Sequence, residues 1–293
     1  MRGAGSSFGI ATHFYMQTEA APSSILSFSA PLASAAKDAD LATKGFETLQ
    51  NLTDLTSNIT FGMYIDSGGA FGLSGWCMEC DLNTFNTSVF PSMISGFPPT
   101  TRSVKRLAWI DALKELANGE SLSQPLGSAY TQHETFYAKS IVSKEAEPLT
   151  TASISSFFSY IMKTQGKGPF YSIINLYGGP GSAINKPSPD SSAYSDRDAL
   201  WVFQNYGYAA GNQTYDPATT EFVNGLNDAI TISQPEGMFK GYLNYVDPDL
   251  SPMMAAEKYY GKETYNRLLE IKMQVDPSFV FWNPQAVGVS ASL

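Results

Sequence analysis

The stretch that decides the fold is GYLNYVDPDLS at residues 241–251, followed by YYGKETYNRLLEIKMQVDPSFVFWNPQ at residues 259–285. Apolar residues at helical spacing predict two helices, over 251–260 and 263–275, and the second ends at Asp276-Pro277 because a proline disfavours helix just before it. Residues 242–246 predict a short strand. On such a strand, Tyr242 and Asn244 share one face because successive side chains alternate.

The rest of the chain mixes strands and helices. The spacing of apolar residues predicts strands at 14–16, 24–33, 59–66, 70–77, 169–179 and 199–208. Helices are predicted at 34–52, 81–95, 103–118, 151–165 and 217–232, with an extended segment within 120–150. No regular βαβ rhythm connects them. The pattern therefore predicts an α+β fold with a mainly antiparallel sheet covered by helices.

Composition narrows the class of protein. The 293 residues are 43% hydrophobic, which is enough for a packed core. A net charge of −9 argues against a nucleic-acid partner, which needs a basic surface, and is compatible with a neutral small-molecule substrate. No apolar run is long enough for a membrane helix, so we expect no membrane partner. Aromatic residues make up 13% of the chain, which suits either carbohydrate stacking or plain core packing.

The two cysteines, Cys77 and Cys80, form a Cys-x-x-Cys pair. Free thiols are the favoured interpretation, with a local disulfide and half of a zinc site as alternatives. A zinc site needs two further ligands, and the only histidines, His13 and His133, are distant in sequence. We therefore predict no metal site.

The chain opens with MRGAGSSFGIATHFYMQT. Its glycines predict a turn whose backbone N–H groups are able to cradle a phosphate. The pattern is weak by itself, because the strand and helix of a dinucleotide-binding turn are missing around it.

Together, residues 1–18 and 168–288 resemble the berberine-bridge-enzyme-like FAD-linked oxidases, especially the fungal carbohydrate oxidases. The resemblance implies a parent flavoprotein that oxidises an alcohol, with the anomeric hydroxyl of an oligosaccharide as the expected group, molecular oxygen as acceptor and peroxide as product. In this family RGAGSSFGI closes the flavin-binding domain, so we expect roughly one further domain to precede Met1. The matching domains are a remnant of the FAD-binding domain at 1–13, a substrate-binding domain at 14–235, and a segment at 236–293 that returns to the FAD domain.

The resemblance also assigns roles. Tyr242, in Tyr-x-Asn, matches the family's catalytic base, which removes the hydroxyl proton while hydride passes to the flavin. Asn175 stands where the family carries an aspartate that assists this tyrosine, and an amide cannot accept a proton at neutral pH. Tyr171 and Gln204 match substrate-binding positions. The residues that match FAD contacts are Gly3, Gly5, Ser6, Gly9, Ile10, Asn244, Asn283 and Gln285.

Two further expectations follow. The segment SAYSDRDALWVFQNY has Asp196 where the family usually carries histidine. Four Asn-x-Ser/Thr sequons, together with the resemblance, predict a secreted glycoprotein. The alternative function is a non-catalytic, truncated homologue that acts at most as a carbohydrate-binding module, because this chain contains only part of the expected FAD pocket.

Overall fold

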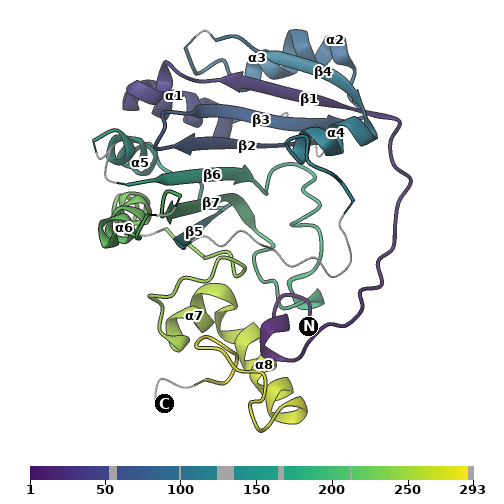
Figure 1. The fold of residues 1–293 in the computed structure, drawn as a ribbon, viewed down its shortest axis with the longest axis vertical. Helices are drawn as coiled ribbons and strands as arrows, with labels where there is room; N and C mark the ends of the chain where they lie inside the picture. Colours follow the sequence, from purple (N-terminus) through teal and green to yellow (C-terminus); the bar gives the residue numbers. More distant parts are fainter. Residues whose placement is uncertain are drawn as a thin grey trace.

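A computed structural model describes residues 1–52, 58–98, 100–123, 135–163, 168–211, 213–235 and 237–289. It confirms the predicted α+β class. A seven-stranded sheet runs in the order β4-β1-β3-β2-β6-β7-β5, and every neighbouring pair is antiparallel (Figure 1). The strands are β1 (Ser24–Pro31), β2 (Ile59–Asp66), β3 (Phe71–Met78), β4 (Ser103–Ala108), β5 (Phe136–Lys144), β6 (Phe170–Leu176) and β7 (Ala199–Tyr208).

The α-helices are α1 (Ala39–Gln50), α2 (Leu82–Thr84), α3 (Phe90–Met93), α4 (Trp109–Leu116), α5 (Thr151–Lys163), α6 (Pro217–Ile232), α7 (Pro252–Tyr259) and α8 (Gly261–Val275). A π-helical turn, Phe85–Val89, joins α2 to α3, and 3-10 turns occur at Gly5–Ser7, Ala35–Lys37 and Pro189–Ser191. Local chemistry fixes the helix starts. For example, Asp216 caps α6 by accepting from the Ala218 N–H, and Pro217 occupies the first turn, where its missing N–H costs nothing.

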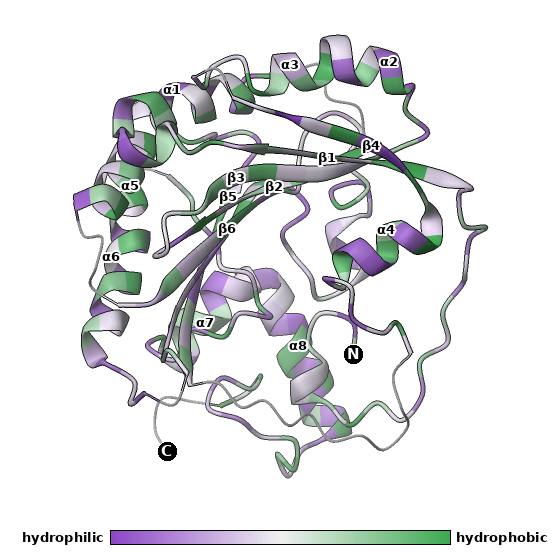
Figure 2. Ribbon diagram, turned by 45° about the horizontal axis from the view of Figure 1, so that its top comes forward, coloured by the Kyte–Doolittle hydropathy of each residue, from purple (hydrophilic) through white to green (hydrophobic). Residues whose placement is uncertain are grey.

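The main core lies between one face of the sheet and the helices α1, α5 and α6 (Figures 1 and 2). Trp201 on β7 is fully buried, with its ring 5.0 Å from that of Phe46 on α1. Phe157 on α5 packs edge-on against Phe203 at 5.3 Å. These aromatic contacts hold the helices α1 and α5 against this face of the sheet.

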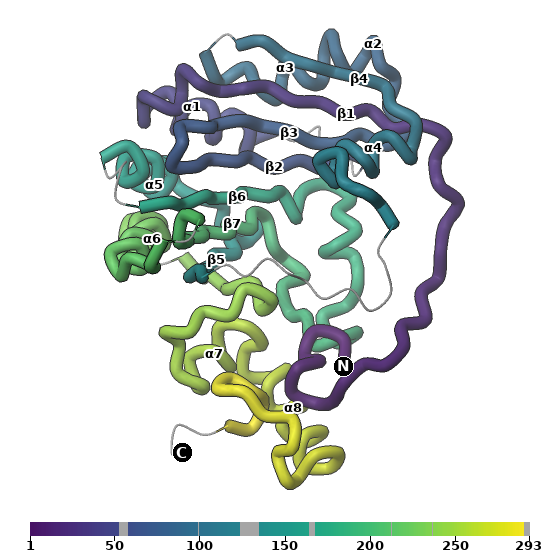
Figure 3. Tube along the Cα trace, in the orientation of Figure 1, coloured from purple at the N-terminus to yellow at the C-terminus, as the bar shows by residue number. Residues whose placement is uncertain are grey.

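A second core joins the two ends of the chain. Ala4, near the start, is buried with Ala255 of α7, Leu268 of α8 and Val287. Lys272 of α8 is completely buried, donates to the backbone oxygens of Ser7 and Phe281, and pairs with Asp276 at 2.6 Å. The long exposed segment that follows residue 9 then runs along the molecule to β1 (Figure 3).

Three local predictions were wrong. The predicted helix 103–118 is a strand followed by a helix, because residues 103–108 pair with β1 as the edge strand and only residues 109–116 coil. The predicted strand at 14–16 is exposed coil, with Tyr15 97% exposed. It lacks a neighbouring strand to satisfy its backbone. The predicted strand 242–246 is a turn, closed by Tyr245 N–H donating to the Tyr242 carbonyl.

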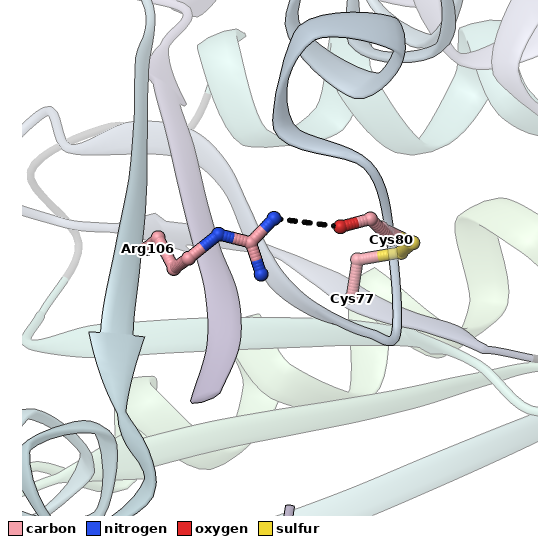
Figure 4. The surroundings of a disulfide bond; sticks show 3 residues. All are labelled: Cys77, Cys80 and Arg106. Atoms are coloured by element: carbon pink, nitrogen blue, oxygen red, sulfur yellow. Dashed lines mark hydrogen bonds between the residues drawn. A yellow bond between two sulfur atoms is a disulfide. The ribbon is translucent and has the colours of Figure 1, made fainter. Parts of the chain in front are cut away.

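The cysteines are joined, contrary to the favoured expectation of free thiols. A Cys77–Cys80 disulfide closes the end of β3, and Cys77 is fully buried. Arg106 of β4 donates to the Cys80 carbonyl at 2.9 Å (Figure 4). The disulfide and this hydrogen bond together tie the end of β3 to β4, which lies two strands away in the sheet.

Candidate active site on the open face of the sheet

The sheet face opposite α1, α5 and α6 carries a row of tyrosines. Side chains alternate along each strand, so Tyr206 of β7 points away from the face that holds Trp201 and Phe203. Tyr171 of β6 stacks on Tyr206 at 4.7 Å with an interplanar angle of 15°, and Tyr64 of β2 stacks on Tyr171 at 6.1 Å. The three rings stack face to face in a continuous row across three strands, so the row lines the open face with aromatic side chains.

Tyr242 lies at one end of this row, on the turn that follows β-bridge residue Lys240. Its N–H donates to Ser140 Oγ of β5 at 2.8 Å, and its side chain packs against the buried cluster of Val142, Ala199 and Val202. Asn244 Nδ2 donates to Tyr242 Oη at 2.9 Å. The two residues predicted to share one face are therefore in contact, although a turn rather than a strand brings them together.

Tyr177, Tyr194 and Tyr245 surround Tyr242. The Tyr177 and Tyr194 rings meet it edge-on at 6.2 and 6.5 Å, and the Tyr245 ring lies 5.3 Å away. Burial, followed by the charge and hydrogen bond of Tyr242, raises the pKa of Tyr177 to about 12. Burial and Asp196 raise the pKa of Tyr194 still further. We call Tyr177, Tyr194 and Tyr242 the tyrosine triad.

Asn175 and Gln204 lie on the same open face. Asn175 is the register partner of Val202, which belongs to the cluster that Tyr242 packs against, and its side chain lies across Gly62 of β2. Gln204 is 6% exposed and pairs in register with Ile173 and Ser140. Within the described residues neither side-chain amide has a hydrogen-bond partner. Both amides are therefore free to bind a ligand at the centre of this face.

The glycine-rich start lies beside the triad. Arg2 O accepts a hydrogen bond from the Ala193 N–H, and Gly3 (φ +84°) fits so closely against Tyr194 that a Cβ there would meet the Tyr194 backbone. Gly3 therefore requires glycine for both its conformation and its contact. Ser6 is exposed and no atom lies within reach of a Cβ added at Gly5, so the backbone here is open to a ligand. Gly9 is half-buried and Ile10 is exposed.

The two residues matched to FAD near the chain end already have protein partners. The Asn283 side chain accepts from the Gln285 N–H. Gln285 Nε2 donates to the carbonyls of Asp247 and Leu250 at 2.6 and 3.0 Å, which ties the chain end to the loop that follows Tyr242. Gln285 Oε1 is buried without a partner among the described residues. Gln285 therefore supports the Tyr242 turn.

The described part of the chain shows neither a metal-binding cluster nor a membrane-spanning helix. No group of three or more His, Cys, Asp or Glu residues there is placed to hold a metal ion, and His133 lies outside the described residues. Among the described helices, none is long and apolar enough to cross a membrane.

Sequence reasoning missed Tyr64, Tyr177, Tyr194 and Tyr206. Tyr64 and Tyr206 carry a usable signal, because each alternates with buried residues on its strand. Tyr177 and Tyr194 lie in loops after β6 and before β7, where no periodicity marks them. Only the folded chain places these two beside Tyr242.

The chain is similar to known proteins over nearly its whole length. The family described as "Berberine and berberine like" matches residues 241–288. A chitooligosaccharide oxidase from Gibberella zeae is 28% identical over 99% of this chain, and a xylooligosaccharide oxidase from Thermothelomyces thermophilus is 30% identical over 98%. The chain spans 58% and 57% of the length of these two curated relatives.

Solved structures show the same fold. A chitooligosaccharide oxidase superposes with a TM-score of 0.86 at 26% identity, covering 99% of this chain and 60% of that one. A xylooligosaccharide oxidase from Myceliophthora thermophila in complex with xylobiose gives a TM-score of 0.84 at 27% identity, covering 98% and 60%. The fold and these relatives agree on one conclusion: residues 241–288 match the berberine and berberine-like family, and the chain as a whole matches the C-terminal part of the fungal carbohydrate oxidases.

Proposed function

We propose that the protein is the substrate-facing part of an FAD-dependent oxidase that oxidises the anomeric hydroxyl of an oligosaccharide, with oxygen as acceptor and peroxide as product. The observation that carries the proposal is the contact between Tyr242 and Asn244 at the end of the tyrosine row. That row supplies an aromatic wall for a sugar site, and Tyr242 supplies a phenol beside it. The relatives named as oligosaccharide oxidases support the substrate class.

The residues near the chain start fit a bound FAD. Gly5 and Ser6 offer an open backbone for a phosphate or ribityl group, and Asn244 is exposed beside Tyr242. Bound there, FAD would accept the hydride that leaves the substrate carbon. Gln285 is a weaker FAD ligand, because its amide N–H groups hold the carbonyls of Asp247 and Leu250.

In the proposed reaction, the chain's own residues bind the sugar and accept one proton from it. Tyr171 and Tyr206 line the sugar site, and Gln204 hydrogen-bonds a hydroxyl. Tyr242 first loses its phenol proton to solvent, and the phenolate oxygen then accepts the proton of the reacting hydroxyl. Asn244 Nδ2 donates to the same oxygen, which stabilises the phenolate.

The test is peroxide formation. The protein with its FAD bound is supplied with cello-, xylo- and chitooligosaccharides, and peroxide and the lactone product are measured. Peroxide in step with lactone supports the proposal. Absence of both products with every sugar, although flavin absorbance shows that FAD is bound, would contradict it.

A second candidate function is a non-catalytic carbohydrate-binding module. It is favoured by Asn175, whose amide cannot take a proton where the family carries aspartate. Titration of tyrosine fluorescence with the same sugars separates the two candidates. Sugar binding by a flavin-bound protein that forms no peroxide favours the module.

We also propose that the protein is secreted and glycosylated. The Cys77–Cys80 disulfide is typical of an oxidising compartment, and the sequon residues Asn51, Asn58 and Asn86 are all exposed. The fourth sequon residue, Asn212, lies outside the described residues. Treatment of the native protein with a peptide N-glycosidase tests this proposal, and an unchanged mass would contradict it.

A further inference from the structure

The segment that carries Tyr242 is held along the free edge of the sheet. β5 is the last strand of the sheet, and Lys240 exchanges two backbone hydrogen bonds with Val142 of β5, at 2.9 and 3.0 Å. Two residues later, the Tyr242 N–H donates to Ser140 Oγ on the open face of the same strand. The segment therefore covers backbone groups that would otherwise be unpaired at this edge.

The same segment also reaches the opposite face of β5. Lys139 directly precedes Ser140, so its side chain points toward the helices, and its Nζ donates to Asn224 Oδ1 of α6 at 2.8 Å. Asp247 Oδ2 lies 3.3 Å from the same Nζ. Residues 240–247, which we call the edge loop, therefore contact β5 through Ser140 on the open face and through Lys139 on the covered face.

The contact between Lys139 and Asp247 is a buried ion pair, because their side chains are only 16% and 4% exposed. Asp247 Oδ2 is buried and has no hydrogen-bond partner within the described residues, and Lys139 is the cation paired with it. Asp249 also lies near Lys139, but at 3.9 Å, and its side chain is 51% exposed, so water shares in compensating its charge. Removal of the Lys139 charge leaves the buried Asp247 without its ion-pair partner, which favours movement of the edge loop toward water.

Asp247 is linked to Tyr242 by a short and closed path. It follows Tyr242 by five residues, and between them the Tyr245 N–H donates to the Tyr242 carbonyl at 2.9 Å. The Asp247 N–H donates to Tyr259 Oη of α7 at 2.9 Å, and Gln285 Nε2 donates to the Asp247 carbonyl at 2.6 Å. The edge loop is therefore fixed at both ends, and a displacement of Asp247 passes to the turn that holds the Tyr242 phenol.

We propose that Lys139 and Asp247 are a positioning pair for Tyr242. Their ion pair on the covered face of β5 fixes the edge loop, and the edge loop places the phenol on the open face. The inference rests on the proposed function for its effect on turnover, whereas its effect on the position of Tyr242 is measurable without flavin or sugar.

The first measurement uses this chain labelled with carbon-13 at the tyrosine Cζ atoms. Tyr242→Phe and Tyr64→Phe variants identify the signals of Tyr242 and of Tyr64, which lies at the far end of the tyrosine row. In Lys139→Met and in Asp247→Asn, the Tyr242 signal should shift while the Tyr64 signal stays in place. Lys139→Arg keeps the positive charge, and its Tyr242 signal should stay close to that of the unmodified chain.

The matched control is Lys144→Met. Lys144 lies on the same strand, its side chain is 17% exposed, and it pairs at 2.8 Å with Asp198, which is outside the edge loop. Its loss should leave the Tyr242 signal unchanged. In the FAD-bound protein, Lys139→Met should lower kcat about tenfold with little change in KM, because the tyrosine row is intact while the phenol is misplaced. Lys144→Met should keep both constants.

Three results would overturn the proposal: a Tyr242 signal that stays in place in Asp247→Asn, a shift of equal size in Lys144→Met, or unfolding of the whole chain in Asp247→Asn. The last result counts against the proposal because this variant keeps the size of the side chain, so general unfolding would assign the pair to the fold as a whole. If no sugar yields peroxide while the Tyr242 signal shifts as expected, the proposed function fails and the positioning pair stands. The two proposals therefore fail separately.

Discussion

The two faces of the central sheet differ in their side chains, although the same strands form both. On β7, Trp201 and Phe203 point to the helices and are buried among aromatic rings, while Gln204 and Tyr206 point to the open face. The covered face is mostly apolar, apart from a buried hydrogen-bonded set of Ser172, Asn205 and Asn227, and the open face carries tyrosines, amides and small residues. Alternate residues of one strand therefore have different roles. One set packs in the core, the other lines the open face, and single substitutions test the two roles separately.

The largest expected effect is on the covered face. Trp201→Ala should lower the free energy of unfolding by about 3–5 kcal/mol, because it empties a fully buried site between Phe46 and Phe61. Tyr206→Ala, on the open face of the same strand, should cost less than about 1.5 kcal/mol. Urea unfolding of both variants measures the difference. Equal losses would contradict the division between the faces.

A second prediction compares two tyrosines. Tyr242→Phe should lower turnover of the FAD-bound protein by about 10²-fold or more, because it removes the proposed proton acceptor, while bound flavin and stability change little. Tyr137→Phe, on the covered face, loses hydrogen bonds with Asp249 at 2.6 Å and Asn224 at 2.9 Å. It should cost about 1 kcal/mol of stability and leave turnover unchanged. Unchanged turnover in Tyr242→Phe would remove Tyr242 from the proposed mechanism.

The sequence predicted the covered face better than the open one. The inner stripe of α6 and the buried residues of β7 follow from simple periodicity, and both elements have the predicted bounds. The helix at 103–118 was wrong because pairing with β1 is a long-range contact that outweighs local helix preference. The open face depends on loops. Tyr177 and Tyr194 lie near opposite ends of the segment that connects β6 to β7. No local pattern predicts that both contact Tyr242.

A third prediction concerns the pH dependence of stability that Asp196, in the loop before β7, should cause. The pKa of Asp196 is raised from 3.8 to about 7 in the folded chain, so its protonated form favours folding. This contribution is fully present below pH 3.8 and is lost as the pH rises through about 7. Between pH 5 and 7 the loss is on the order of 2 kcal/mol. Chemical denaturation at several pH values should show a smaller decrease in Asp196→Asn than in the unmodified chain. The same slope in both would assign the pH dependence to other groups.

The smallest expected effect is at Asn175, where the open face departs from the family pattern. Asn175→Asp places a carboxylate beside Val202, in the cluster that Tyr242 packs against, and a carboxylate accepts a proton where an amide cannot. Turnover should rise by up to about tenfold, because the carboxylate is able to accept the proton that Tyr242 must lose before it acts as base. Gln204→Glu adds the same charge one strand away, and we expect weaker sugar binding there without a gain in turnover. Equal gains in both variants would show that negative charge anywhere on the open face has this effect, and Asn175 would then hold no special position relative to Tyr242.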